Sequence, residues 1–541
     1  MDSIKSFLGR GANAIVVLLL LACVIQIPYF CHAEFFFDSD EAYNALLSQR
    51  MLHGNFHSLS LPGAPYQGVL EPLCSIPLQL ILGPTAVAYK AGIFGFCLIY
   101  IIFAFATLRL LGISKPLAFI SMLPFALGSW QLKALAFFGV GGHMTITALG
   151  SMALYFMFLY RQAAHKKNIY LFACACLLGL AYYTYSLAIC YLMLVLLVQV
   201  FEKGLTQSIK DLFLTRSGAS VLAGFALGVL PLLLKKLWHP IVAHGSYFQI
   251  ATPAKIYQSF VLLWTQCVPY LIGVNYAGNV DVQNQLLIQV RGFYGVVSSV
   301  YAWVFLSFVV FLLVYYWTEL RLYLQFKRRP LMPGAIMILG VYIMMALILA
   351  TPAMLDLPSR RYLLPLLSFL PFLLAEFFQF IARTGGKTAL KGVAVLLLVF
   401  VVLHQYTFLS QNALLGGVPT QKEQALREVL GFLNEEQIPR SFSEYWISHK
   451  LTYLAQGRHV SITGPDADRD APYTQVVLDQ MRAEPSVPVA YVFFKGSIAG
   501  QRWQAYAQAQ HLAYQTYENS QYVVVYGLPQ AQRLVFASIY I

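Results

Sequence analysis

Long apolar runs recur along most of this chain, and they constrain its fold more than any other feature. A helix needs about 20 apolar residues to cross a bilayer core of about 30 Å, and most of these runs approach or exceed that length. They cover 12–33, 85–110, 116–132, 143–160, 169–184, 185–201, 218–237, 293–318, 332–351, 362–382 and 390–408. Backbone polar groups find no water inside a bilayer, so the runs predict helices. We therefore expect a mostly α, polytopic membrane bundle of about 11 spans.

The composition agrees with a membrane protein and excludes several other classes. Hydrophobic residues make up 59% of the 541 residues and charged residues only 11%, whereas soluble domains carry about a quarter charged residues. The net charge of +13 does not indicate a nucleic-acid partner, because Lys and Arg are scattered in short gaps between the apolar runs. Six of the 8 cysteines lie within these runs, and all 8 are interpreted as packing residues.

The gaps between the runs predict the topology. Every second gap is rich in Lys and Arg, which belong on the cytoplasmic side. An odd number of spans that begins in the cytoplasm places the end of the chain outside. We expect a bacterial inner-membrane protein with a transmembrane domain over 1–408 and a soluble periplasmic domain over 409–541. The composition of this C-terminal segment is polar and mixed, and strands are predicted at 489–494 and 521–526. We therefore expect a small α/β domain there.

Two outer gaps, 34–84 and 238–291, are too long for simple connections. Long segments on one face of a helical bundle commonly carry the functional site. The first gap contains Asp38, Asp40 and Glu41, followed by apolar positions at helical spacing. This stretch predicts an amphipathic helix on the membrane surface, with acidic residues in its first turn.

Two interpretations of these acids remain open. In the first, they cap the helix and complement its dipole. In the second, they lie at the hydrocarbon boundary beside the head group of a lipid-linked substrate, where a carboxylate accepts a proton from a hydroxyl. Downstream, Glu71 is either an ordinary interfacial residue or part of an acidic pocket with Asp40 and Glu41. Such a pocket suits a divalent cation, so a metal requirement remains open, and the sequence indicates no other cofactor.

Basic residues on the outer side depart from the usual charge distribution of membrane proteins. Arg360 and Arg361 directly precede the tenth run on its outer side, and Lys235 and Lys236 end the seventh at the same level. Snorkelling explains one such pair. Several pairs on one leaflet indicate a bound anion, and the planar guanidinium of arginine suits phosphate. His143, at the outer end of the fourth run, is either a capping or core residue or a ligand.

Short motifs spread over most of the chain form a further pattern. They are Asp40-Glu41-Ala42, Tyr66-x-Gly68-x-x-Glu71, Gly141-Gly142-His143, Gly228-x-x-Pro231, Arg361-Tyr362-Leu363-x-Pro365, Glu444-Tyr445-Trp446 with Leu451-Thr452, and Arg469 through Tyr473. Together they resemble the polyprenyl-phosphate-dependent glycosyltransferases of the GT-C fold, the group that includes the protein O-mannosyltransferases and the aminoarabinose transferase of lipid A.

This resemblance implies a GT-C fold and an inverting transfer of a sugar from a polyprenyl-phosphate donor to a lipid, glycan or protein acceptor on the outer face. It implies that Asp40 is the general base, with Asp38 and Glu41 as its neighbours. The substrate-binding positions are expected at Tyr66, Glu71, His143 and Tyr362.

This sequence departs from the motif pattern of the family at one place. The aminoarabinose transferase has Glu-Lys-Pro-Pro where this chain has Glu71-Pro72-Leu73, so the lysine that would meet the donor phosphate is missing. We expect Arg361 with Arg360, or the pair Lys235 and Lys236, to supply that charge.

Other functions remain open. A flippase or transporter of lipid-linked sugars is one, although ion-coupled transporters place ionisable residues near the middle of the bilayer and these runs are nearly free of them. A polymerase or ligase that joins preassembled glycans would share the outward site and the lipid donor. A structural scaffold would leave the acidic loop and the outer arginines unexplained.

Overall fold

The computed structural model describes residues 2–54, 59–163, 168–238, 250–274, 280–281, 286–287, 292–324, 331–351, 357–416, 418–463 and 471–530. The chain forms two compact units. The first unit comprises 1–27, 94–137 and 141–415, and the second comprises 28–93, 138–140 and 416–541. Helices α1 and α4 contribute residues to both units.

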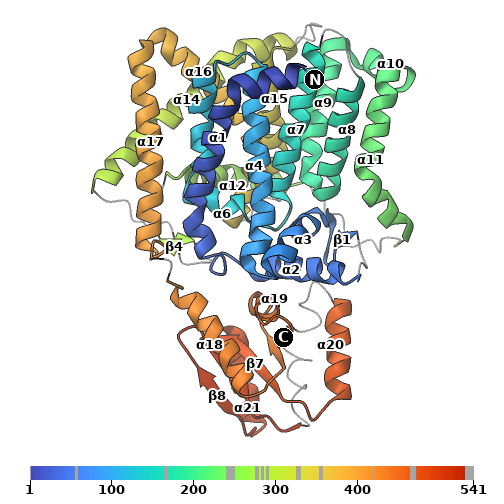
Figure 1. The fold of residues 1–541 in the computed structure, drawn as a ribbon, viewed down its shortest axis with the longest axis vertical. Helices are drawn as coiled ribbons and strands as arrows, with labels where there is room; N and C mark the ends of the chain where they lie inside the picture. The colour runs from blue at the N-terminus through green and yellow to red at the C-terminus, as the bar shows by residue number, and fades with distance from the viewer. Residues whose placement is uncertain are drawn as a thin grey trace. The chain divides into compact units, whose positions relative to one another are not determined.

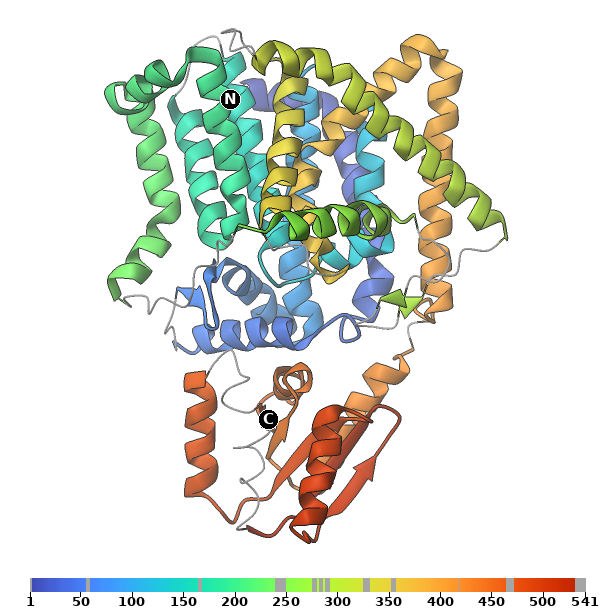
Figure 2. The same cartoon turned by 180° about the vertical axis from the view of Figure 1, so that it is seen from behind.

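Helices make up almost all of the first unit (Figures 1 and 2). In chain order they are α1 (Asp2–Cys31), α4 (Ala86–Leu110), α5 (Lys115–Ala126), α6 (Trp130–Ala136), α7 (His143–Gln162), α8 (Asn168–Thr184), η1 (Ser186–Ala188), α9 (Ile189–Lys203), α10 (Leu205–Leu214), α11 (Arg216–Trp238), α12 (Pro253–Leu262), η2 (Leu263–Cys267), α13 (Val268–Ile272), α14 (Gly292–Leu324), α15 (Pro333–Ala350), η3 (Leu357–Ser368), α16 (Leu370–Thr384) and α17 (Gly386–Gln411). The short strands β3 (Val280–Asp281) and β4 (Leu286–Leu287) form an antiparallel pair.

The described helices confirm a multi-pass membrane protein. Eight of them are long and apolar enough to cross a membrane, and η3 with α16, which meet at a bend of 61°, make nine if this pair is counted as one span. All nine fall on predicted runs. The two remaining runs, 116–132 and 169–184, correspond to shorter apolar helices, so the count of 11 spans stays a prediction for them.

The predicted run 116–132 is broken by a glycine. Helix α5 ends at Ala126, Gly128 has a φ of +60°, and Ser129 caps α6 by accepting a hydrogen bond from the N–H of Leu132. Glycine adopts this left-handed conformation without steric cost, whereas most other residues do not. A hydropathy average over the run does not detect this break, because most of the neighbouring residues are apolar.

The motif Gly228-x-x-Pro231 lies in α11, where it packs against α8. A Cβ at Gly228 would lie 2.2 Å from the carbonyl oxygen of Cys176, and a Cβ at Gly179 would lie 2.6 Å from that of Phe225. Small residues at such positions let two helix backbones approach closely within a membrane. The glycine of this motif therefore has a packing role.

The second unit contains a five-stranded sheet of order β6-β5-β7-β9-β8. Strand β5 runs parallel to β6 and β7, whereas β9 runs antiparallel to β7 and β8. Its elements are α2 (Ser39–Leu52), β1 (Ser60–Leu61), β2 (Ala64–Gly68), α3 (Leu70–Leu82), α18 (Gln421–Glu435), β5 (Arg440–Ser443), α19 (Tyr445–Leu454), β6 (Val460–Ile462), α20 (Ala471–Ala483), β7 (Val489–Phe494), α21 (Ile498–Ala509), β8 (Gln515–Glu518) and β9 (Tyr522–Tyr526). The strands predicted at 489–494 and 521–526 are β7 and β9.

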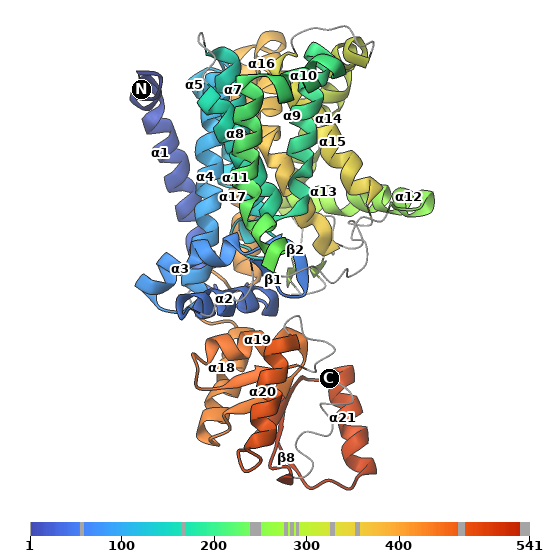
Figure 3. The same ribbon diagram turned by 90° about the vertical axis from the view of Figure 1, so that its right-hand side faces the viewer.

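Both faces of this sheet are covered. Tyr491 and Phe493 of β7 pack with Trp503 of α21 on one face, whereas Ala490 and Val492 pack with α18 and α19 on the other. Figure 3 shows α18 and α21 on opposite sides of the strands. A strand that is buried on both faces reads as a continuous apolar run, which is why β7 could be predicted from the sequence.

The segment 28–93 belongs to the same compact unit as the sheet. The sequence assigned its loop, 34–84, to the membrane domain over 1–408. In the structure, α2 packs against α3 on one side and against α19 of the C-terminal part on the other. The acidic stretch is therefore built into the second unit.

Candidate active site

Helix α2 carries the acidic stretch, and Asp38 caps it. The Asp38 carboxylate accepts a hydrogen bond of 2.9 Å from the N–H of Glu41. This contact confirms the capping interpretation for Asp38. Burial, together with the nearby charges of Glu41 and Asp40, raises the pKa of the Asp38 carboxyl from 3.8 to about 7. Asp38 therefore titrates near neutral pH.

The prediction of a one-sided surface helix is wrong for α2. All residues from Ser39 to Ser48 are buried. Ala42, Ala45 and Leu46 pack in one apolar cluster with residues of α4 and α19, and Leu47 and Met51 pack in another with β1 and β2. Apolar residues on two faces of the helix explain its burial.

Glu41 forms a buried ion pair with Lys90. The Nζ of Lys90 lies 2.8 and 2.7 Å from the two carboxylate oxygens of Glu41, and the main-chain N–H of Gly139 donates to Oε1 at 2.8 Å. Burial raises the pKa of Glu41, whereas the Lys90 charge and these hydrogen bonds oppose that rise. Glu41 is thus committed to structural contacts.

Sequence reasoning missed Lys90, although a signal was present. Lys90 stands alone near the start of the apolar run 85–110. A charged side chain in such a place needs a partner, so the run predicts a nearby acid without naming it. The structure supplies Glu41.

The backbone of Gly139 lies close to both Glu41 of the ion pair and the ring of Tyr89. Its carbonyl oxygen accepts hydrogen bonds from the Asn44 amide at 2.8 Å and the Tyr89 hydroxyl at 2.7 Å. A Cβ at this position would lie 2.5 Å from the ring of Tyr89. The glycine is therefore required sterically.

Asp40 stands in the sequence between the cap residue Asp38 and Glu41 of the ion pair, with 4% of its surface exposed. The Tyr445 hydroxyl of α19 donates a hydrogen bond to its Oδ1. Beside it, the Ser39 hydroxyl donates to the carbonyl oxygen of Tyr445 at 2.5 Å and accepts from the N–H of His449 at 3.3 Å. The C-terminal domain thus reaches the predicted base directly.

Two further predicted residues lie in the second unit. Glu71 is buried in the first turn of α3, and Tyr66 of β2 is 36% exposed. The part of the chain that the structure describes contains no group of three or more His, Cys, Asp or Glu side chains that could hold a metal ion. Neither Asp40 nor Glu71 belongs to such a group among the described residues.

The first unit brings together His143, Tyr362 and the arginine pair. His143 is the first residue of α7, and its buried ring makes edge contacts with Tyr185 at 5.0 Å and Tyr362 at 5.1 Å between ring centroids. The Arg361 guanidinium carbon lies 5.6 Å from the centroid of the Tyr362 ring. These contacts place a cation beside aromatic faces, a combination that suits a phosphorylated sugar.

Arg360 lies next to this cluster and is buried. Its guanidinium carbon is 4.8 Å from the centroid of the Tyr270 ring. Both arginines lie in the first half of η3, a 12-residue 3₁₀ segment. Runs of this helix type longer than about four residues are uncommon and often mark functional segments.

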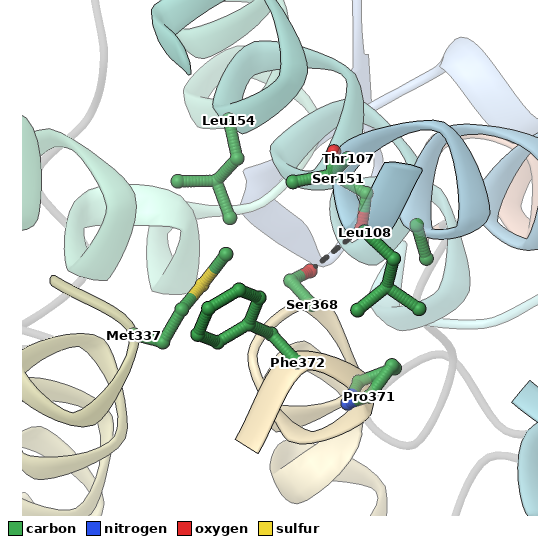
Figure 4. A pocket seen from close by; sticks show the side chains of 9 residues that line it. Thr107, Leu108, Ser151, Leu154, Met337, Ser368, Pro371 and Phe372 are labelled. Carbon is green, nitrogen blue, oxygen red and sulfur yellow. Dashed lines mark hydrogen bonds between the residues drawn. The ribbon is translucent and has the colours of Figure 1, made fainter. Parts of the chain in front are cut away.

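Polar contacts inside the helical bundle hold the end of η3. The Ser368 hydroxyl lies 2.9 Å from that of Ser151 and 2.7 Å from that of Tyr191, and the Tyr100 hydroxyl donates to the carbonyl oxygen of Leu367 at 3.0 Å. Ser151 and Ser368 border a cavity of about 10 Å³, roughly the size of one water molecule (Figure 4).

A larger apolar cavity of about 110 Å³ lies elsewhere in the first unit. Residues of α5, α14, α16 and α17 contribute to its walls. They include Pro124, Phe125, Tyr301, Phe305, Phe308, Leu374, Phe377 and Val401. Its chemistry suits a hydrocarbon chain.

The substrate roles of all the site residues stay predictions, and so do three expectations about where they lie. The backbone of Lys235 and Lys236 lies in α11, but their side chains fall outside the described residues, as do 239–249 of the second outer gap. Arg469 of the C-terminal motif also lies outside them. Asp40 belongs to the second unit and Arg361 to the first, so a shared cavity for the two remains an expectation.

Comparison with known proteins identifies the fold. No protein-family model and no curated protein sequence matches the chain. The structure of ArnT from Cupriavidus metallidurans in the apo state is similar, with a TM-score of 0.62, 14% sequence identity, and coverage of 95% of this chain and 98% of that chain. The structure of the same ArnT bound to undecaprenyl phosphate has a TM-score of 0.56, 13% identity, and coverage of 96% and 98%. These likenesses confirm the predicted GT-C fold.

Proposed function

We propose that this chain, which has the GT-C fold, is a bacterial inner-membrane glycosyltransferase that uses a polyprenyl-phosphate sugar donor. The observation that carries the proposal is the fold likeness over 96% of the chain to an ArnT structure that holds undecaprenyl phosphate. The apolar cavity of about 110 Å³ is compatible with part of a prenyl chain. The sugar would pass, with inversion, to a lipid, glycan or protein acceptor on the periplasmic face, where the C-terminal domain would lie.

Asp40 is the general base in this proposal. Its two acidic neighbours make structural contacts: Asp38 caps α2, and Glu41 forms an ion pair with Lys90. Asp40 instead accepts a hydrogen bond from a hydroxyl, the same kind of group that an acceptor presents. Asp40 also lies in the first turn of α2, at the end of the helix where the main-chain N–H groups are exposed.

The reaction is a single displacement at the anomeric carbon. The acceptor oxygen forms the new glycosidic bond while the bond to the donor phosphate breaks, the electron pair leaves with the phosphate, and Asp40 takes the hydroxyl proton. Arg361 and Arg360 would neutralise the charge that develops on the phosphate, because a guanidinium binds phosphate oxygens through parallel hydrogen bonds. Lys235 and Lys236 are the alternative for this role.

Aromatic and polar groups near Asp40 and near Arg361 would hold the sugar and the acceptor. His143 and Tyr362 contact each other near Arg361. Tyr66 and Glu71 occupy the second unit with Asp40. We assign substrate binding to these four residues.

The test is the glycan product of a deletion strain that carries wild-type protein or Asp40→Asn. We expect the variant to insert normally and to lose at least about 10²-fold of transfer, as removal of a general base usually costs. Exposed Asp479→Asn, in the same unit, is the matched control and should give normal product. Normal product from Asp40→Asn would exclude Asp40 as the base.

The same strains separate the alternative functions. Mass analysis of glycolipids and glycoproteins should show the loss of one sugar, whereas a polymerase or ligase would lose a whole preassembled glycan. Movement of a lipid-linked sugar across vesicles of purified wild-type protein, without any transfer, would contradict the enzyme and favour a flippase.

A further inference from the structure

Tyr445 connects the C-terminal domain to the proposed base. Its hydroxyl donates a hydrogen bond to Oδ1 of Asp40, although the two residues are 405 positions apart in the sequence. We propose that Tyr445 is a positioning residue for the transfer reaction: it fixes the orientation of the Asp40 carboxylate toward the acceptor. This inference rests on the proposed function of Asp40.

The main chain of Tyr445 is itself held against α2. The Ser39 hydroxyl bonds to the carbonyl oxygen of Tyr445 and to the N–H of His449, one turn further along α19. Ser39 is fully buried and directly precedes Asp40. The phenol and the carboxylate are therefore fixed relative to each other by contacts on adjacent residues.

The ring of Tyr445 is also confined. It makes edge contacts with His449 at 5.6 Å and with Trp446 at 5.3 Å between ring centroids. His449 in turn contacts Tyr43, which lies one turn after Ser39 in α2, at 5.1 Å. This aromatic chain restricts the rotamers that Tyr445 can adopt.

The opposite face of α19 packs on the sheet. Ile447 and Leu451 are buried with Val492 and Val524 in the apolar core that covers one face of the strands. One face of α19 thus depends on the folded C-terminal domain, and the other reaches Asp40. The domain that the sequence treats as an appended tail supplies part of the support of the site.

A hydrogen bond to one carboxylate oxygen limits rotation about the Cβ–Cγ bond of aspartate. The second oxygen then keeps one direction, which is what a base needs when it takes a proton from a positioned hydroxyl. Loss of this contact should lower kcat, because the Asp40 carboxylate would be less well oriented toward the acceptor hydroxyl in the reactive complex. The KM values should change little, because Tyr445 is assigned no contact with the donor.

The test uses the full-length protein with Tyr445→Phe, which removes only the hydroxyl. Tyr453→Phe is the matched control, because Tyr453 lies in the same helix but donates to the carbonyl oxygen of Thr85 at 3.1 Å. We expect Tyr445→Phe to lower kcat about tenfold with KM values within about twofold, and Tyr453→Phe to keep kcat within about twofold. Equal losses of kcat in the two variants, or no loss in either, would overturn the proposal.

A second background separates positioning from a general loss of structure. In Asp40→Glu the carboxylate is displaced by one methylene, so Tyr445→Phe should then lower kcat by less than about twofold. The same tenfold loss in both backgrounds would contradict a role through Asp40. If Asp40→Asn keeps full transfer, the proposed base itself is wrong; if Asp40→Asn is inactive while Tyr445→Phe matches wild type, only the present inference fails.

Discussion

Lys90 and Glu41 form an ion pair that solvent does not reach, with side-chain exposures of 1% and 0%. Both carboxylate oxygens accept hydrogen bonds from Lys90, and one accepts a further bond from Gly139. Removing two charges from water is costly, so such a pair is stable only when its geometry and hydrogen bonds are complete. The pair fixes α2 beside the first residues of α4.

Replacement of Lys90 by methionine should destabilise the protein strongly. Glu41 would remain buried without its cation, which typically costs about 3–5 kcal/mol. Thermal and denaturant unfolding of the purified protein measure this change in the free energy of unfolding. The double variant Lys90→Met with Glu41→Gln should recover most of the loss, because the buried charge is then absent.

The exposed pair Lys495 and Glu518 provides the control. Their charged atoms lie 3.4 Å apart, and both side chains are about half exposed. Lys495→Ala should therefore cost less than about 1 kcal/mol. A Lys90→Met protein that is as stable as this control but has lost donor binding would instead place Lys90 in the phosphate site.

A shift of the Asp38 pKa predicts a pH dependence of stability. The folded pKa of about 7 lies above the ordinary value of 3.8, so the native state keeps a proton that the unfolded chain releases between these values. The stability from Asp38 is therefore complete below about pH 3.8 and is lost as the pH rises toward 7. The Asp38→Asn variant should not lose this stability as the pH rises, because the asparagine side chain stays neutral and still caps the helix.

Unfolding of wild type and Asp38→Asn between pH 4 and pH 8 checks this prediction. The stability of the variant relative to wild type should rise with pH and become constant above about pH 7, where Asp38 is ionised in both states. A difference that does not change with pH would show that Asp38 does not titrate in this range.

The sequence predicts the membrane helices well and the site only in part. Apolar runs define the spans without any knowledge of neighbours, and Asp38 predicts the start of α2 because capping is local. The burial of α2 could not be predicted, because its covering helix α19 lies about 400 residues later in the chain. The contact of Asp40 with Tyr445 is missed for the same reason. Lys90 was detectable as a lone charge, but its partner depends on tertiary packing.

Gly139 offers a steric test of the same region. In Gly139→Ala the new Cβ would lie 2.5 Å from the Tyr89 ring, so the backbone that donates to Glu41 must shift. We expect a loss of about 1–3 kcal/mol of stability, as for other overpacked core sites. Gly431→Ala in α18 is the control, because no atom lies within 4 Å of its Cβ and alanine favours a helix by about 0.5–1 kcal/mol. Equal stability of the two variants would mean that the approach at Gly139 relaxes freely.

Arg361 provides the test of the donor end of the site. If its guanidinium binds the donor phosphate, Arg361→Ala should weaken donor binding about tenfold or more, because charge-assisted hydrogen bonds of this kind contribute about 1.5–3 kcal/mol. Arg361→Lys should recover only part of the affinity, since an ammonium lacks the planar fork. The exposed Arg321→Ala, in the same unit, changes the net charge equally and should bind the donor like wild type. Binding is measured with undecaprenyl phosphate in detergent micelles as the probe. Donor affinity that is unchanged in Arg361→Ala would remove this residue from the phosphate site and leave the role to Arg360 or to the pair Lys235 and Lys236.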